Sequence, residues 1–430
     1  MISSFELGKT LDSAKNRGVF RPYLRSVNVR WNQIDLSDIN EMKIEDNELE
    51  RYSIKKGDLL ICEGGDVGRS CVWNSDQVIY YQNALHRVRF YENIDPYFYM
   101  YIMMYYTFTG KLLEICKGVT IKHLTRATLQ SLLFPLPPLN ECVRITNKIK
   151  EVDNYISSLN NANDDILELI QITKAKILGL AIQGKLVPQN PDDEPASILL
   201  ERIRKEKEEL IKEGKLKREK KESIIYRGDD NSYYEKFSGK PEKCIDGDLP
   251  FKIPDNWRWE RIRNLFILNP KNNIDDNMIV SFIPMAMIDD GYTGDFTYEK
   301  KPWGACKKGF THFADGDICF AKISPCFENR KSALFVGLNN GYGSGTTELY
   351  VLRRFTEDLL PEYILSFIKS EFFINRGKNT FSGVVGQQRV DKDIILDTFI
   401  PVPSKQEQKK VYEKIQQAFN EIEMIEDCIS

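Results

Sequence analysis

The apolar and polar positions follow the same pattern at two places along the chain, and both predict a strand that begins at a turn. Gly57 and Asp58 precede the apolar run LLIC, and Gly316 and Asp317 precede ICFA. A Gly-Asp pair is typical of a tight turn, and a short apolar run bounded by turn residues predicts a buried strand. A small or polar loop follows in each case. The pattern therefore predicts one structural corner that is built twice.

The features after this corner keep the same order in both copies. Each copy continues with a half-buried strand, an apolar helix near a proline, a glycine-bearing stretch and a proline pair before a polar helix start. Pro135 and Pro401 are 266 residues apart, as are Glu141 and Glu407. This order predicts a tandem duplication. The matched stretches are 84–91 with 345–354, 95–108 with 360–373, 117–129 with 382–396, and 134–149 with 399–415.

Each copy ends in a predicted long helix, the first starting near Asn140 and the second running from Lys405 to about Asp427. A polar-faced helix of this length is poorly stable alone, so we expect the two helices to pair with each other. The fold class predicted is α+β, with two pseudo-symmetric strand-rich domains, each followed by a long helix, and the helices forming an antiparallel coiled coil. The apolar stripes comprise Ile145, Ile149, Val152, Ile156, Leu159, Ile166, Leu169, Ile172, Ile177 and Leu180, then Val411, Ile415, Phe419, Ile422 and Ile425.

The composition changes between the two copies predict four segments. They are a first domain at 1–138, a helical region with linker at 139–240, a second domain at 241–403 and a distal helix at 404–430. Within the second segment we expect a helix at 195–210 and a loose linker at 226–243. The charged run between them is best interpreted as a solvated helix face, since acids and bases interleave, and a nucleic-acid or partner contact is the alternative.

The two copies differ at their ends. The second copy has an opening strand, NWRWERIRNLFIL, whereas the first copy begins almost directly at Phe5, which aligns with Phe266 near the end of that strand. We expect either that residues before the first copy were lost or that its edge strand is supplied elsewhere. The second helix also stops at Ser430, short of its counterpart, so both ends are expected to be trimmed.

Charge and cysteine usage narrow the class of protein. The net charge is −3, the nine cysteines form no C-x-x-C pair and the three histidines lie far apart. We therefore expect neither a disulfide framework nor a metal site, and a reducing cytoplasm fits. No signal peptide is expected, and the most apolar run, 97–108, is too short to span a bilayer.

The duplicated phrases, taken in order, resemble the DNA-specificity subunit of type I restriction-modification systems. They are PYLRSVNVRW, GDLLICEGGDVGR, YYQNALHRVR, FPLPPLNE, LAIQGKLVPQ, LPFKIPDNWRW and PVPSKQEQ. The resemblance implies that each domain is a target recognition domain reading one half of a split DNA sequence. It also implies that the helices fix the gap between half-sites and dock two methyltransferase subunits and the restriction subunits. S-adenosylmethionine, ATP and Mg would then belong to those partners, and this chain would carry no cofactor.

The absence of recognisable catalytic motifs favours a non-catalytic subunit. The strings GGDVGRS and LNPKNN match neither the cofactor turn nor the Asn/Asp-Pro-Pro-Tyr/Phe motif of an adenine methyltransferase, and the sequence contains no phosphate-binding G-x-x-x-x-G-K-[ST] loop. Two alternatives remain open. One is a free-standing DNA modification or cleavage enzyme with an unrecognised motif, and the other is a duplicated structural scaffold.

Candidate DNA contacts follow from residue type, because Lys, Arg, Ser and Thr suit phosphates while Arg, Asn and Gln suit base edges. In the first domain a basic segment, a glycine loop and a later Lys-rich stretch are favoured. Their alternatives are an idle basic hairpin and a tight structural turn. The candidates are Lys15, Asn16, Arg17, Arg21, Tyr23, Arg25, Asn28 and Arg30; Gly65 and Arg69; and Lys117, Thr120, Lys122 and His123.

The second domain offers different residues at matching places. Within them, VGQQR is the best candidate for reading bases, because two amides and an arginine follow a glycine. Divergence on a shared scaffold is what reading two different half-sites requires. The candidates are Lys271, Asn272 and Asn273; Lys322, Ser324, Asn329, Arg330 and Lys331; Ser344, Thr346 and Thr347; and Gln387, Gln388 and Arg389.

Overall fold

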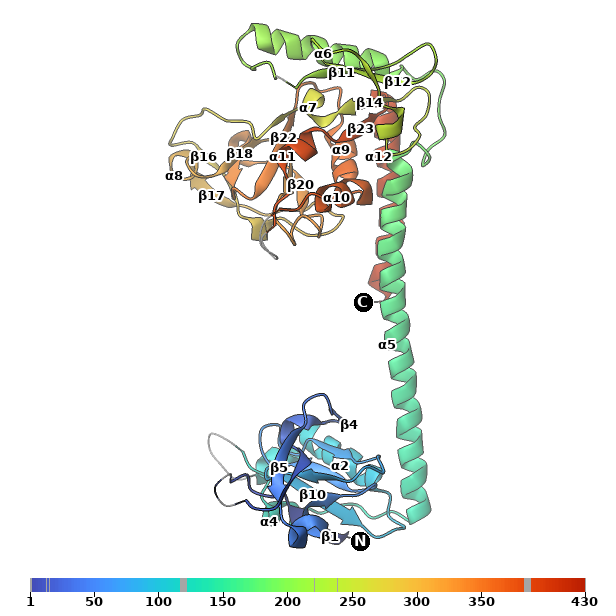
Figure 1. Ribbon diagram of the computed structural model, residues 1–430, viewed down its shortest axis with the longest axis vertical. Helices are drawn as coiled ribbons and strands as arrows, with labels where there is room; N and C mark the ends of the chain where they lie inside the picture. The colour runs from blue at the N-terminus through green and yellow to red at the C-terminus, as the bar shows by residue number, and fades with distance from the viewer. Residues whose placement is uncertain are drawn as a thin grey trace. The chain divides into compact units, whose positions relative to one another are not determined.

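The structure, a computed structural model, describes residues 2–12, 14, 16–116, 122–219, 221–237, 239–382 and 388–429 (Figure 1). It divides into two compact units, Met1–Ala162 and Asn163–Ser430. The four predicted segment boundaries are finer than this division and stay predictions. Along the described part of the chain, no helix is long and apolar enough to cross a membrane.

The first unit contains two four-stranded sheets, with the orders β1-β10-β7-β8 and β5-β2-β9-β6. Side chains alternate across a strand. Leu59 and Ile61 of β7 therefore face the core that holds α2, whereas Leu60 and Cys62 face the core of the second sheet. The strands are β1 (Ile2–Leu7), β2 (Val19–Leu24), β3 (Val29–Arg30), β4 (Gln33–Ile34), β5 (Asn40–Ile44), β6 (Ser53–Ile54), β7 (Leu59–Cys62), β8 (Ser70–Val72), β9 (Ile79–Tyr81) and β10 (Leu85–Phe90).

Helices cover one face of the first of these sheets. The apolar run at 97–108 forms helix α2, as the sequence predicts, and five of its residues are buried. Asp95 caps the helix by accepting a hydrogen bond from the Tyr97 amide at 3.0 Å, and Pro96 occupies the first turn, where no amide donor is needed. The helices are α1 (Leu49–Tyr52), α2 (Pro96–Phe108), α3 (Lys111–Ile115), α4 (Arg126–Gln130) and α5 (Leu139–Ile182).

The second unit repeats both sheets in the same order, which confirms the duplication. Its sheets read β15-β22-β19-β20 and β17-β16-β21-β18. Each unit also has one parallel strand pair at the same place, β2 with β9 and β16 with β21. The strands are β15 (Phe266–Leu268), β16 (Ile279–Ile283), β17 (Glu299–Pro302), β18 (Thr311–Ala314), β19 (Ile318–Ala321), β20 (Ser332–Leu334), β21 (Tyr342–Gly345) and β22 (Leu349–Arg354).

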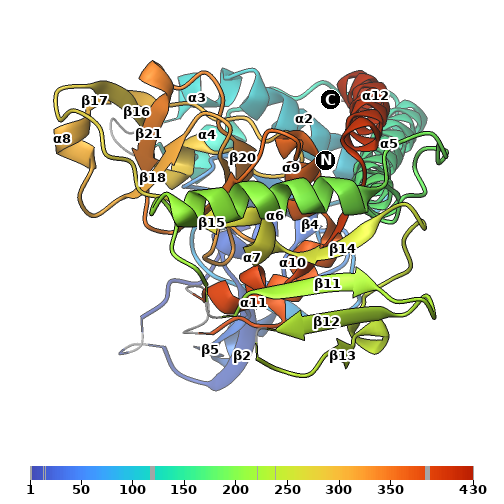
Figure 2. The same cartoon turned by 90° about the horizontal axis from the view of Figure 1, so that it is seen from above.

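The second unit also has elements that the first does not show among its described residues. Helix α6 (Ala196–Lys212), labelled in Figure 2, matches the helix predicted at 195–210. The predicted loose linker at 226–243 is wrong, because residues 226–227, 233–237 and 243 lie in a three-stranded sheet with the order β11-β12-β13. Arg261 joins this sheet to β14 through two bonds to the Glu235 carboxylate at 2.5 and 2.7 Å. The sheet comprises β11 (Ser223–Arg227), β12 (Tyr233–Phe237) and β13 (Lys243–Cys244).

The opening strand of the second unit is shorter than predicted. Strand β14 (Arg258–Arg261) pairs antiparallel with β23 (Phe399–Val402), and the helical turn α7 (Ile262–Leu265) separates it from β15. The remaining helices are α8 (Trp303–Cys306), α9 (Pro361–Ile368), α10 (Glu371–Lys378), α11 (Lys392–Leu396) and α12 (Lys405–Ile429).

The two long helices pair antiparallel, as the sequence predicts, over the part of α5 that belongs to the second unit. Lys174 bonds to Glu426 at 2.8 Å, and Leu178 shares a core with Ile415 and Phe419, so residue numbers rise along α5 as they fall along α12 (Figures 1 and 2). The apolar stripes are not buried throughout. The exposed members are Val152, Ile156, Leu159, Leu169, Ile172 and Ile425.

Candidate nucleic-acid interface

In the first unit, main-chain hydrogen bonds join three segments that are distant in sequence. The Glu63 amide, just after β7, donates to the Ala84 carbonyl at 2.9 Å, and the Leu124 amide donates to the Glu63 carbonyl at 2.8 Å. The glycine loop, the turn before β10 and the stretch before α4 therefore meet at one surface. We call the segments 63–65, 83–84 and 122–124 corner 1.

The second unit builds the same corner with the same bonds. The Lys322 amide, just after β19, donates to the Glu348 carbonyl at 2.9 Å, and the Val390 amide donates to the Lys322 carbonyl at 2.9 Å. We call the segments 322–324, 346–348 and 388–390 corner 2. Three candidate stretches that the sequence could not relate to one another are thus neighbours.

A buried side chain fastens each corner to the strand beneath it. The His86 Nε2–H donates to the Leu124 carbonyl at 2.8 Å, and the Tyr350 hydroxyl donates to the Val390 carbonyl at 3.0 Å. Burial lowers the pKa of His86, and its ring stacks on Phe5. The same anchor point is therefore kept with different chemistry in the two units.

An ion pair at the start of the buried strand is also duplicated. The Asp58 carboxylate accepts two bonds from Arg89 at 2.7 and 2.6 Å, and Asp317 accepts two from Arg353 at 2.8 and 2.6 Å. Burial raises the pKa of Asp317, and the Arg353 guanidinium opposes that shift. The repeated Gly-Asp turn is thus scaffold, and the aspartate ties β7 or β19 to its neighbouring strand.

Corner 1 presents small and basic groups to solvent. Gly65, Lys122 and His123 are all exposed. Gly65 has a φ of +76°, which only glycine adopts readily, and a Cβ built on Gly64 would lie 3.4 Å from His123 Nδ1. Backbone and side chains here can approach a ligand closely. Lys117 and Thr120, also candidates, lie outside the described residues.

Corner 2 presents a polar and charged set. Arg389 makes a bidentate pair with Glu348, with both contacts at 2.9 Å, and this pair lowers the pKa of the Glu348 carboxyl. Thr347 is exposed, Thr346 and Gln388 are half-buried, and the Lys322 ammonium lies 5.5 Å from the Tyr350 ring centre. A paired guanidinium fork is held in one orientation, which suits recognition of a base edge.

Ser324 belongs to corner 2 but faces inward. Its hydroxyl accepts a bond from the Gln388 amide at 3.2 Å, and its own amide donates to the Gln388 carbonyl at 2.8 Å. Ser324 therefore positions Gln388 instead of contacting a ligand. Gln387 lies outside the described residues.

The basic segment at 14–31 is only partly available at the surface. Arg17 and Arg30 are exposed and have no ion-pair partner among the residues with described positions. Arg21 is half-buried on β2, and Asn16 donates to the Thr10 carbonyl at 3.1 Å. Lys15 lies outside the described residues.

Four other candidates from the first unit hold the hairpin together. Tyr23 and Asn28 are buried, so their prediction as direct DNA contacts needs correction. The Asn28 amide group donates to the Asp35 and Asp38 carbonyls at 3.1 and 2.9 Å. Arg25 pairs with the Asp38 carboxylate at 2.5 Å, and Arg69 donates to the Ser26 carbonyl at 2.9 Å and pairs with Asp66.

In the second unit, Asn272 is also engaged internally. Its amide oxygen accepts two bonds from Arg353 at 3.1 Å, and its amide group donates to the Phe313 carbonyl at 2.8 Å. It therefore supports the Asp317–Arg353 pair, while the neighbouring Lys271 is exposed.

The loop that carries Asn329 and Arg330 depends on a lysine that sequence reasoning missed. The buried Lys369 ammonium donates to the carbonyls of Gly291, Arg330 and Ser332 at 2.7, 3.2 and 3.1 Å. Burial lowers its pKa to about 8. The Arg330 Nε–H donates back to the Lys369 carbonyl at 3.0 Å. The only signal in the sequence is a single cation in the apolar stretch ILSFIKSEFF.

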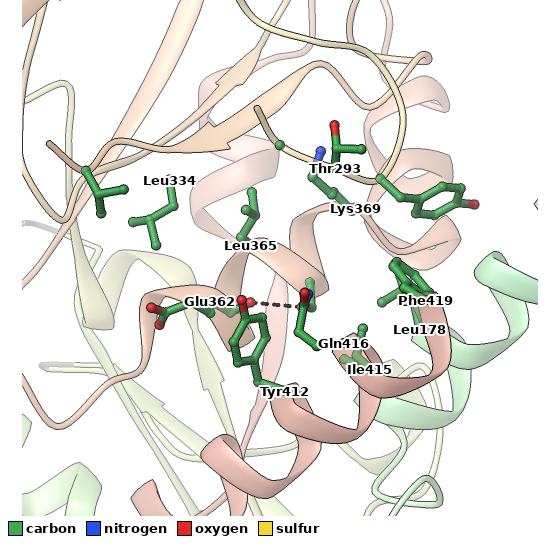
Figure 3. Close-up of a pocket in the computed structure, with 14 residues that line it drawn as sticks. Leu178, Thr293, Leu334, Glu362, Leu365, Lys369, Tyr412, Ile415, Gln416 and Phe419 are labelled. Carbon is green, nitrogen blue, oxygen red and sulfur yellow. Dashed lines mark hydrogen bonds between the residues drawn. The ribbon is translucent and has the colours of Figure 1, made fainter. Parts of the chain in front are cut away.

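A cavity of about 260 Å³ lies beside this lysine. In Figure 3 Lys369 lies next to Thr293, while Tyr412 and Gln416 of α12 lie further along the wall. The cavity is bounded by α9, α12 and the end of α5, so it belongs to the packing between the second unit's sheet and its helix pair.

Neither corner, in its described residues, has a cluster of side chains that could bind a metal ion. Within the described ranges, no group of three or more His, Cys, Asp or Glu residues is placed to hold a metal ion. Lys, Arg, His, Thr and Gln, the groups at these corners, are suited to hydrogen bonding with nucleic acid.

Comparison with known families matches the chain twice to one model. Residues 5–168 and 262–429 match the type I restriction modification DNA specificity domain. The two matches contain corners 1 and 2 respectively and cover most of the chain. The chain therefore belongs to this family.

Curated relatives match over part of the chain. The chain is 41% identical over 263 residues to the EcoAI specificity subunit of an Escherichia coli type I restriction enzyme, covering 60% of this chain and 41% of that protein. It is 42% identical over 248 residues to the EcoEI specificity subunit of the same species, covering 57% and 39%. The aligned region thus spans less than half the length of either relative.

Solved structures share the fold over nearly the whole chain. A chain from work on complex assembly and conformational transition of the type I R-M system has a TM-score of 0.57 at 14% identity, covering 99% of this chain and 92% of that one. The HsdS subunit from Thermoanaerobacter tengcongensis has a TM-score of 0.50 at 13% identity, covering 98% and 88%.

Proposed function

We propose that this chain is the DNA-specificity subunit of a type I restriction-modification complex and reads a two-part DNA target with a fixed gap. The duplicated corner carries this proposal. Two units hold three surface segments together with equivalent main-chain bonds, and the side chains that they present differ. Gly65, Lys122 and His123 at corner 1 would contact one half-site, and Gln388 and Arg389 at corner 2 would contact the other.

The chain itself is proposed to be non-catalytic. The absence of methyltransferase and phosphate-loop motifs from the sequence supports this view, and no observation favours the alternative of a free-standing enzyme. S-adenosylmethionine, ATP and Mg would be bound by partner subunits. Those partners would be two methyltransferase subunits and the restriction subunits, in the cytoplasm, and the long helices α5 and α12 are the proposed docking elements.

The net charge of the chain leads to a prediction about how strongly the isolated chain binds DNA. Its net charge is −3, so it lacks the overall positive field that nonspecific DNA binding requires. We expect the isolated chain to bind duplex weakly and with a steep dependence on salt, and the partner subunits to supply much of the clamping charge. Tight binding of random duplex by the isolated chain at high salt would contradict this expectation.

An electrophoretic mobility shift with purified methyltransferase tests the function. The duplexes would carry a two-part target found by methylation sequencing, the same target with its gap lengthened, or a random sequence. The proposal predicts a shift of the first duplex at lower protein concentration than either of the others, and methyl transfer only when both subunits are present. Methyl transfer by the isolated chain would overturn the non-catalytic assignment.

A further inference from the structure

The first unit has an uncovered sheet edge at the place where the second unit has a paired strand. In the second unit, β23 receives β14 as an antiparallel partner, with Trp259 opposite Pro401 and Glu260 opposite Ile400. The equivalent stretch of the first unit is 133–136, which has no strand partner among the residues that the structure describes. An unpaired edge is a template for an added strand.

The exposed fractions of equivalent residues in the two units show how much apolar surface this edge leaves in water. Leu133 is 87% exposed, whereas its counterpart Phe399 is 6% exposed. Leu136 is 58% exposed, whereas its counterpart Val402 is 0% exposed. Apolar side chains that one unit buries completely are therefore left in water in the other.

A small cavity beside this edge matches the helical turn that follows β14. It has a volume of about 70 Å³ and is lined by Ile2, Phe5, Val88, Tyr99 and Phe134, among others. In the second unit the counterparts of Val88, Tyr99 and Phe134 share a core with two residues of α7. Those counterparts are Leu352, Ile364 and Ile400, and the α7 residues are Ile262 and Leu265.

The proline in the edge does not prevent pairing. Pro135 corresponds to Pro401, and Pro401 lies within β23 opposite Trp259. The second unit thus demonstrates that this stretch accepts an antiparallel strand. We propose that the edge at 133–136, with the adjoining cavity, is a docking site for an extended tryptophan-bearing segment of a partner chain, added in the way that β14 adds to β23.

The structure also indicates the chemistry of the partner segment. In the second unit Trp257 and Trp259 are buried, and they pack edge-on against Tyr363 and Phe399 respectively, each at 6.3 Å between ring centres. Arg263 of α7 pairs with Asp397, but the first unit has Ser131 at that position. The site therefore selects aromatic and aliphatic side chains, and it does not require the arginine. A second copy of this chain cannot supply its own Trp257, because that residue is fully buried.

A peptide titration tests this site independently of DNA binding. A fluorescently labelled peptide of residues 249–265 would be titrated with the full chain, and anisotropy would report binding. We expect saturable one-to-one binding that weakens by about tenfold or more with Leu136→Asp in the chain or Trp257→Ala in the peptide. Leu113→Asp, at another exposed leucine of the first unit, is the matched control and should bind as the unaltered chain does.

A fusion variant provides the second readout. Residues 256–265 would be placed directly ahead of Ile2, which lies opposite Phe90 as Phe266 lies opposite Arg354 in the second unit, so the aligned Phe5 corresponds in register to Leu268. We expect this variant to lose peptide binding, because the site is then filled within the chain, and to unfold at a higher temperature. Absence of saturable binding, equal weakening by Leu136→Asp and Leu113→Asp, or unchanged peptide binding by the fusion would each overturn the proposal.

Discussion

At the scale of single residues, the two corners differ in how their charged groups are held. Arg389 is fixed by a bidentate pair with Glu348, whereas Lys122 and His123 are exposed on corner 1. A fixed guanidinium fork loses less freedom when it binds a base edge, because its orientation is set in advance. We therefore expect sequence discrimination to depend more strongly on Arg389 than on Lys122.

Replacing Arg389 tests this expectation. Arg389→Ala should weaken binding of the target by about 1–3 kcal/mol and relax discrimination within one half-site only. Competition binding with the methyltransferase present, using single-base variants of both half-sites, is the measurement. Lys308→Ala, at an exposed cation outside corner 2, is the control. An equal loss with both variants would indicate a general charge effect.

His86 makes the first unit sensitive to acid. Burial lowers its pKa in the folded chain, so the unfolded chain takes up a proton at a higher pH than the folded chain does. The contribution of His86 to stability is complete above the ordinary histidine pKa, about 6.5, and is lost progressively as the pH falls below that value and through the lowered pKa of the folded chain. Each unit of pKa difference corresponds to about 1.4 kcal/mol.

His86→Gln removes this titration while keeping an N–H donor for the Leu124 carbonyl. Urea unfolding followed between about pH 7.5 and about pH 5.5 should show a smaller loss of stability on acidification for the variant. Burial also lowers the pKa of His312 in the second unit, so some acid sensitivity remains in both proteins. Identical pH dependence in the two proteins would show that His86 does not titrate as described.

At the scale of elements, Lys369 connects two loops and one strand to the end of α9. Its three carbonyl partners belong to the loop at 291, the loop at 330 and strand β20. A buried cation is tolerated only when its donors are satisfied, and removing it leaves the carbonyls without partners. The loop that presents Asn329 and Arg330 thus depends on a residue that does not itself reach the surface.

Lys369→Met tests this dependence. The variant should lose about 1–3 kcal/mol of unfolding free energy, because three buried carbonyls lose their donor. Amide hydrogen exchange should increase first at residues 289–296 and 327–332. Lys409→Met, at an exposed lysine on α12 that pairs with Glu413 of the same helix, is the control and should leave both regions protected. A stable variant with unchanged exchange would contradict the assigned role.

Elements with a clear local pattern of apolar residues could be predicted from the sequence. Elements that are held by contacts between distant residues could not. Helices α2, α6, α5 and α12 follow from apolar spacing or apolar content, which a short window contains. The β11-β12-β13 sheet was missed because its strands are rich in polar residues. It is held in place by long-range contacts such as the Arg261–Glu235 pair.

The candidate site could likewise be predicted only as far as local sequence determines it. Residue type selected all three stretches of corner 2 and two of the three stretches of corner 1, but it missed 83–84 and could not distinguish an exposed asparagine from a buried one. Asn28 and Asn272 resemble base-reading residues in sequence, yet their amides are used within the fold. The role of Lys369 depends on three carbonyls remote in sequence, so no local pattern could have revealed it.

At the scale of the whole molecule, the duplication separates what is shared from what differs. The ion pairs Asp58–Arg89 and Asp317–Arg353, the strand orders and the corner bonds are common to both units. The exposed side chains at the corners are not. A scaffold kept constant beneath different surfaces is what independent reading of two half-sites requires, and it makes each half separately alterable.

Methylation sequencing of cells carrying this chain and its partner subunits tests that claim most directly. Three strains would be compared: the unaltered chain, Lys122→Ala with His123→Ala, and Gln388→Ala with Arg389→Ala. The account predicts a split motif with a fixed gap, in which the corner 1 variant changes one half and the corner 2 variant changes only the other. A continuous motif, or a variant at one corner that alters both halves equally, would contradict it.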